Sequence, residues 1–180
     1  MKKILKLTFI LFLVCAVTAG ILGVVNELTK DRIEQINIEN TNKAYQSVLA
    51  SESFTDLGYS SDAHPNVDKI SKADNGAGYV VESTFSGAQG MITMACGVDN
   101  DFNCTGISII KHSETSGLGA NAASSADVGV NWRAQFVGVG EDVKLTKAGG
   151  TIDALAGATI TSRTVTETVA DSIAAVKEVA

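Results

Sequence analysis

The ten residues Asp153-Ala-Leu-Ala-Gly-Ala-Thr-Ile-Thr-Ser162 join a strand-like segment to an amphipathic C-terminal helix, and the interpretation of the whole chain depends on them. The small residues at 156–158 allow another molecule to approach the backbone closely. Thr159 then presents a hydroxyl beside the free N–H groups of the helix start, where phosphate can bind. Small-residue turns before helices are common, however, and capping of the helix by Thr159 or Thr161 explains the same residues.

A second candidate segment, residues 111–119, reads Lys-His-Ser-Glu-Thr-Ser-Gly-Leu-Gly and follows a predicted strand. Glycines on both sides of Leu118 permit an unusual backbone path, which suits a loop that closes over a ligand. An ordinary polar loop after a strand has the same composition. The residues alone therefore leave both possibilities open.

The motif D-A-L-A-G-A-T at the start of the first segment resembles D-x-x-(S/T)-G-A-T, at which a flavin transferase joins FMN to a threonine through a phosphoester. That motif belongs to the G subunit of Rnf-type electron-transport complexes and to the related C subunit of sodium-translocating NADH:quinone reductase. The resemblance implies that Thr159 carries the FMN, with Gly157, Ala158 and Thr161 beside it. Ala156 departs from the family's pattern, which has Ser or Thr at this position.

The second segment is similar to the H-x-E-T-P-G-L-G loop of the same family, which lies against the flavin. The resemblance implies that Glu114 and Thr115 line the flavin and that Leu118 packs on its ring. Ser116 replaces the family's proline. This replacement would give the loop more conformational freedom, because proline restricts the backbone. His112 matches the family as well, but a lone loop histidine is more often structural or solvated.

The composition favours a membrane-attached globular domain. The chain of 180 residues can hold one domain and an accessory segment. Hydrophobic residues make up 45% of it, and the mean hydropathy is positive. The net charge of −6 repels phosphate backbones, so the sequence predicts no nucleic-acid partner. The histidines and cysteines show no metal-ligand spacing, and we expect no metal site.

An apolar segment without charges runs for 19 residues from Leu7 to Val25. It is long enough to cross a hydrocarbon core of roughly 30 Å as a helix. The alternative is a signal peptide cleaved after Val17-Thr18-Ala19, but the apolar run continues beyond that point, as it does in an anchor. We therefore expect residues 1–25 to be an uncleaved transmembrane anchor in the lipid bilayer.

Charge near the N-terminus sets the expected orientation. Three lysines lie within the first six residues, and residues 1–25 contain no Asp or Glu. The positive-inside rule then places the N-terminus in the cytoplasm. We expect a single-pass protein of the cell (inner) membrane, in which a helix at 26–50 connects the anchor to an extracytoplasmic FMN-binding domain at 51–180.

Together with the resemblance, these patterns predict an α+β fold: an N-terminal transmembrane helix, then one FMN-binding domain with a mainly antiparallel sheet flanked by helices. Residues 51–75, rich in Ser, Asp, Gly and Asn, predict a surface loop with little regular structure. Asp99-Asn100-Asp101 predicts a hairpin turn. The remaining expected elements are strands at 79–85, 91–98, 104–110 and 143–146, a short return strand at 151–152, and helices at 132–136 and 161–179.

A hairpin that closes symmetrically about Asn100 would place Cys96 opposite Cys104. Facing Cβ atoms lie about 4.5–5.5 Å apart, close to disulfide reach only in the tighter pair type. An extracytoplasmic location permits oxidation. Two cysteines that face one core need no bond, so a disulfide and a pair of buried thiols both remain possible.

The resemblance implies a membrane-anchored electron-carrier subunit with covalently bound FMN in an Rnf-type complex. Such a complex couples electron transfer between ferredoxin and NAD to sodium or proton translocation. The implied partners are the other membrane and peripheral subunits and the flavin transferase. The chain would be a redox subunit without catalytic residues of its own. The alternative is an anchored extracytoplasmic binding or scaffold module that carries no redox cofactor.

Overall fold

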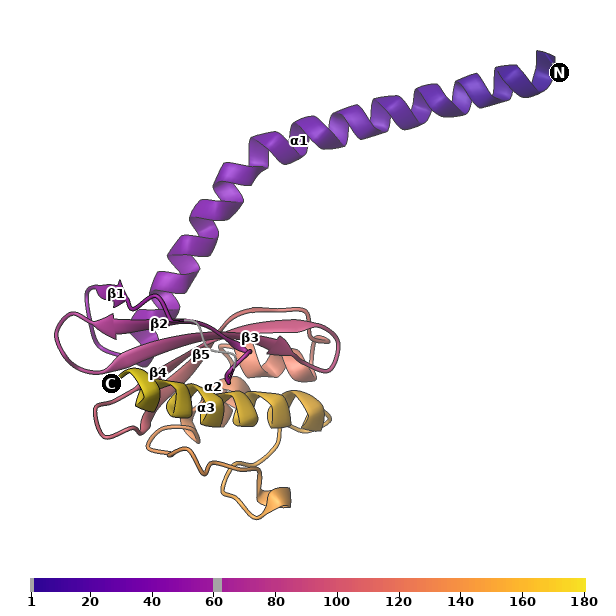
Figure 1. Cartoon of the computed structure of the whole chain (residues 1–180). Helices are drawn as coiled ribbons and strands as arrows, with labels where there is room; N and C mark the ends of the chain where they lie inside the picture. Colours follow the sequence, from indigo (N-terminus) through magenta and orange to yellow (C-terminus); the bar gives the residue numbers. More distant parts are fainter. Residues whose placement is uncertain (1, 60–62) are drawn as a thin grey trace. The chain divides into compact units, whose positions relative to one another are not determined.

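The computed structural model describes residues 2–59 and 63–180, which form three α-helices, five strands and two short 3-10 helices (Figure 1). Contacts divide the chain into two units, Met1–Asn40 and Thr41–Ala180. The elements in chain order are α1 Lys2–Val48, β1 Phe54–Asp56, β2 Val67–Ala73, β3 Tyr79–Ser86, β4 Met91–Val98, β5 Cys104–His112, η1 Gly119–Ala123, α2 Asp127–Ala134, η2 Thr146–Ala148 and α3 Thr159–Val179.

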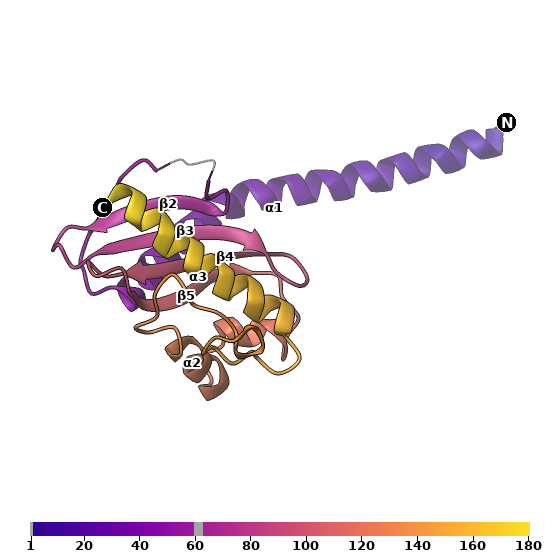
Figure 2. The same cartoon turned by 60° about the horizontal axis from the view of Figure 1, so that its bottom comes forward.

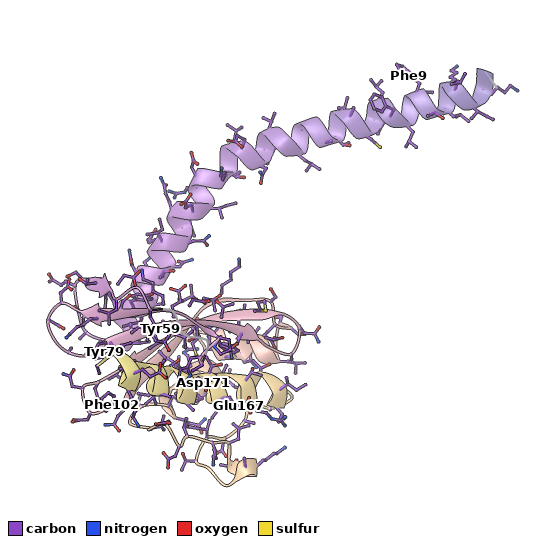
Figure 3. All side chains as sticks on the ribbon, viewed as in Figure 1. Phe9, Tyr59, Tyr79, Phe102, Glu167 and Asp171 are labelled. Atoms are coloured by element: carbon purple, nitrogen blue, oxygen red, sulfur yellow. The ribbon has the colours of Figure 1, made fainter. Side chains whose placement is uncertain are left out.

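The first unit is the long N-terminal part of α1. Its large apolar side chains are exposed, including Phe9, which is labelled in Figure 3. By length and composition the helix can cross a membrane. Helix continues without interruption through the segment after Val25, so the helix that we expected there is present up to Val48.

The second unit contains an antiparallel sheet in which the strands follow one another in the order β1-β2-β3-β4-β5. β3 and β4 pair over their full length, from Tyr79 opposite Val98 to Ser86 opposite Met91. The three strands expected between 79 and 110 are confirmed, each to within two residues. With a long apolar helix before the sheet and helices around it, the α+β class is confirmed.

Helix α3 covers one face of the sheet, where it lies across β2, β3 and β4 (Figure 2). Its apolar stripe is fully buried, as the period of about 3.6 residues predicts. This stripe consists of Val165, Val169, Ile173 and Val176. Trp132 and Phe136 join the same core with ring centroids 5.2 Å apart. The helix expected at 132–136 is present as α2, which begins earlier, at Asp127, and ends at Ala134. The closing helix is confirmed as well and begins at Thr159.

The opposite face of the sheet carries the end of α1. Ala44, Tyr45 and Val48 are buried there against Val80 and Ala95. The hydroxyl of Tyr45 donates a hydrogen bond of 2.9 Å to Glu82 on β3, and the hydroxyl of Thr105 donates to the carbonyl of Val48. The sheet is therefore buried on both faces, between α3 and the last turns of α1.

Two predictions of secondary structure are wrong. Residues 51–75 contain β1 and β2 rather than an irregular loop, although residues 60–62 of this segment lie outside the described residues. β2 is rich in polar residues, and the buried side chains that identify it as a strand are separated by charged ones. The strands expected at 143–146 and 151–152 are instead one parallel bridge, between Leu145 and Ile152, which flank η2.

The register of the β4–β5 hairpin differs from the symmetric one. Cys96 pairs with Ile107, and Cys104 pairs with Val98, because the ladder contains a register shift next to a turn that runs from Asp99 to Asn103. The two sulfur atoms still lie 3.7 Å apart in the core, and both cysteines are free thiols. The predicted turn is present and is stabilised by the Asp99 carboxylate, which accepts backbone N–H groups.

We predict that Gly97→Ala disturbs the contact between the sheet and α1. A Cβ atom at this position would lie 2.6 Å from the Val48 carbonyl oxygen and would also clash with the Thr105 hydroxyl. Such overpacking lowers the free energy of unfolding by about 1–3 kcal/mol, measurable by urea unfolding of the detergent-solubilised chain. Gly140→Ala is the control, because its Cβ would meet only Asp142 at an ordinary 3.6 Å. Equal effects of the two substitutions would contradict this explanation.

Candidate functional site

Three segments of the second unit meet at the start of α3. They are the loop at 112–118 with η1, helix α2, and the turn at 153–158 that leads into α3. The two segments that the sequence singled out therefore lie together, and α2 lies between them in the chain. How each is fixed decides which groups stay available for a ligand.

The turn before α3 requires glycine at one position. Gly157 has φ of +71°, in the left-handed region that side chains other than glycine rarely adopt. A Cβ atom there would lie only 2.8 Å from Cδ2 of Leu118, so this leucine lies directly over the turn. Gly157 thus allows both the backbone path and the close approach of the second segment.

Ser162 closes the turn from the helix side. Its hydroxyl accepts the backbone N–H of Leu155 at 2.9 Å and donates to the carbonyl of Ala158 at 2.9 Å. Helix α2 and the residue that caps its C-terminus hold the other end of the turn: the Trp132 indole N–H donates to the carbonyl of Asp153, and the Gln135 amide oxygen accepts the N–H of Asp153. The sequence contained no spacing that would have identified Trp132 and Gln135 as supports of the motif.

Glu114 and Thr161 join the loop to the helix. The Thr161 hydroxyl is fully buried and donates a 2.5 Å hydrogen bond to one carboxylate oxygen of Glu114, and the other oxygen accepts the N–H of Gln89 at 3.0 Å. Burial raises the pKa of Glu114, but the bonds from Gln89 and Thr161 and the backbone of residues 88 and 90 outweigh it, so the pKa is lowered. Glu114 is 8% exposed and already engaged on both oxygens.

Thr159 lies on the other side of the same helical turn. It lines a cavity of about 270 Å³ between α3 and the segment at 143–148, together with Arg163 one turn later. Residues 159 and 161 point in different directions because two residues of a helix are about 200° apart. The structure thus brings Glu114, Leu118, Gly157 and Thr161 together, and it places the Thr159 side chain in a separate cavity.

The other predicted site residues differ in exposure. Thr115 is exposed, and its carbonyl accepts the N–H groups of Leu118 and Ala120. Leu118 is 45% exposed despite its contact with the turn. Ala158 is buried at the helix start, whereas Ala156, which replaces the family's hydroxyl residue, is exposed.

We predict that Glu114→Gln lowers the free energy of unfolding at pH 7 by about 1–3 kcal/mol, because charge-assisted hydrogen bonds are lost. Because the pKa of Glu114 is lowered in the folded chain, its ionised carboxylate stabilises the fold at pH values above 4.5, the ordinary pKa of this group. This stabilisation is lost as the pH falls through the pKa of the folded state. The difference between wild type and variant should therefore shrink below about pH 4.5, measured by urea unfolding across pH. Glu52→Gln, at an exposed position, is the control. A difference that stays constant with pH would contradict the assignment.

Comparison with known proteins identifies both parts of the chain. The FMN-binding domain family matches residues 87–174, which include the loop, α2 and the turn before α3. The RnfG N-terminal region matches residues 1–48, the same residues as α1 within one position.

Two relatives match this chain over about nine tenths of their own length. The chain is 34% identical over 175 residues to the G subunit of the ion-translocating oxidoreductase complex of Methanosarcina acetivorans, with 92% of this chain and 90% of the relative covered. It is also 34% identical over 194 aligned positions to the G subunit of the Na(+)-translocating ferredoxin:NAD(+) oxidoreductase complex of Acetobacterium woodii, covering 96% and 91%. The chain therefore belongs to the family of G subunits of Rnf-type ion-translocating ferredoxin:NAD oxidoreductase complexes and has the FMN-binding domain of that family.

Proposed function

We propose that the chain carries FMN in a phosphoester bond to the hydroxyl of Thr159. One observation supports this residue above its neighbours. Helix α3 contains seven Ser or Thr residues, and six of them donate hydrogen bonds to groups of the described chain. The seventh, Thr159, makes no hydrogen bond among the described residues, and it lines a cavity. The fold thus leaves this one hydroxyl available for modification.

The surroundings of Thr159 fit a flavin phosphate. The residue before it caps α3 without a side-chain hydrogen bond, so no hydroxyl competes for the helix start. The cavity beside Thr159 is rimmed by lysine and arginine side chains. A mainly apolar cavity with a few polar groups is typical of cofactor sites.

The proposed role is that of an electron carrier. Bound FMN supplies reversible acceptance and release of electrons, while the protein supplies position and local charge. Leu118 contributes an exposed apolar surface directly above Gly157, at the position that the family resemblance assigns to ring packing. Glu114 holds this loop on α3 through Thr161, and Thr115 and Ala158 shape the backbone around it. Because both of its carboxylate oxygens accept hydrogen bonds within the chain, Glu114 has the role of positioning this loop.

The wider assignment is that the subunit works within an Rnf-type complex that couples electron transfer between ferredoxin and NAD to sodium or proton translocation. The names of the relatives include both ions. The Acetobacterium woodii relative belongs to a sodium-translocating complex, and the Clostridium ljungdahlii relative, 36% identical over 104 residues, belongs to a proton-translocating one. The partners are then the other subunits of the complex and a flavin transferase that forms the ester.

The proposed location is the cell membrane, with residues 1–25 as the anchor, 26–50 as the connecting helix and 51–180 as the extracytoplasmic FMN-binding domain. The apolar length of α1 supports the anchor. The lysines near the N-terminus and the absence of acidic residues before Asn26 support the orientation. Attachment by an ester would keep the flavin on the protein outside the cytoplasm.

We predict that Thr159→Ala abolishes covalent flavin in chain produced together with a flavin transferase. Denatured wild-type chain should give a fluorescent band under ultraviolet light, and the Thr159→Ala band should be dark. Thr164→Ala, on the same helix, is the matched control and should stay fluorescent. A dark wild-type band would instead favour a scaffold module without a redox cofactor. Ala156 and Ser116, the two departures from the family's motifs, would agree with that function. If fluorescence survives Thr159→Ala but is lost in Thr161→Ala, the flavin is attached to Thr161 and the assignment to Thr159 is wrong.

We also predict that protease added to intact spheroplasts digests the domain at 51–180, because it faces outward. Immunoblotting with an antibody against the C-terminal helix measures the loss. A cytoplasmic protein that stays intact and an external protein that is digested are the controls. Protection of the domain under these conditions would reverse the proposed orientation.

A further inference from the structure

The cavity beside Thr159 has two sides. One side is the N-terminal part of α3, and the other is the segment from Val143 through η2. Its volume is about 270 Å³. The lining residues are Val143, Lys144, Leu145, Lys147, Ala148, Thr159, Arg163, Thr166 and Glu167.

Positive charge is concentrated at this cavity. Lys144, Lys147 and Arg163 line it, and none of them forms an ion pair with the described residues. Lys177, by contrast, pairs with Glu141 at 2.6 Å. One carboxylate, that of Glu167, also lines the cavity and projects from α3 (Figure 3). The lining therefore has an excess of two positive charges in a chain whose net charge is −6.

The segment that carries the two lysines is held by backbone hydrogen bonds. The carbonyl of Lys144 accepts the N–H of Ile152, and the carbonyl of Leu145 accepts the N–H groups of Ala148 and Gly150. The cations thus start from a fixed backbone, which reduces the entropy lost when they bind an anion. Arg163 lies one turn after Thr159 on the same side of α3.

We propose that this cationic cavity binds the phosphate group of the flavin, with Arg163 as the principal phosphate-binding residue and Lys144 and Lys147 as supporting charges. A phosphoester on Thr159 is negatively charged, and its oxygens would lie beside a guanidinium that can donate two parallel hydrogen bonds. Buried apolar side chains, Val143 and Leu145, line the same cavity and strengthen these bonds by limiting water. The inference rests on the proposed attachment to Thr159.

The test compares two flavins that differ only in the phosphate. Full-length chain from cells without a flavin transferase is titrated in detergent with FMN and with riboflavin, and flavin fluorescence gives each Kd. We expect FMN to bind at least about tenfold more tightly than riboflavin at low salt, with the ratio falling as salt is added. Arg163→Gln should reduce the ratio to about threefold or less. Glu167→Gln should increase it, because it removes the opposing carboxylate.

Arg32→Gln is the matched control, since it removes the same charge from α1 in the first unit and should leave the ratio unchanged. Equal binding of FMN and riboflavin, binding of neither flavin, or a ratio that Arg163→Gln does not change would each overturn the proposal. The two proposals fail separately. A chain that acquires covalent FMN but shows no phosphate preference would refute the phosphate site alone, and a chain with the preference that never acquires FMN would refute the attachment alone.

Discussion

The hydrogen bond between Thr161 and Glu114 is the interaction on which the arrangement of the site depends. It is buried, charge-assisted and joins segments 47 positions apart in the chain. The bond turns Thr161 toward the loop that carries Glu114, and Thr159, two residues earlier on the helix, lines the cavity on the other side. It also keeps the loop on α3, with Leu118 over Gly157. One contact therefore separates the first turn of α3 into a structural side and a side open to a cofactor.

The fold places this turn on a rigid support. α3 lies on one face of the antiparallel sheet, and the last turns of α1 cover the other. The stripe of valine and isoleucine along α3 is buried from Val165 to Val176, so the position of Thr159 follows from the packing of the whole helix. Ser162, Trp132 and Gln135 then fix the turn before it. A site held in this way can keep a cofactor at one position.

Sequence patterns predicted the features that local chemistry determines. The small-residue turn, the amphipathic closing helix and the hairpin at Asp99 each have a short-range signal, and each is present. β2 was missed because its polar residues hide a strand that only pairing with β3 reveals. The hydrogen bonding of each hydroxyl on α3 could not be predicted either, since the Thr161 hydroxyl is bound and that of Thr159 has no partner among the described residues only because of tertiary contacts. The place of Arg163 beside the cavity could not be predicted from the sequence either, because this residue belongs to no recognisable motif.

Peptide mapping by mass spectrometry tests the central claim most directly. Trypsin cuts after Lys147 and Arg163, so one peptide, residues 148–163, contains the turn and four hydroxyl side chains, Thr151, Thr159, Thr161 and Ser162. For chain isolated from cells with an active flavin transferase, the account predicts that this peptide carries one FMN and that fragmentation places it on Thr159. An unmodified peptide, or FMN on any of the other three hydroxyls, would contradict it.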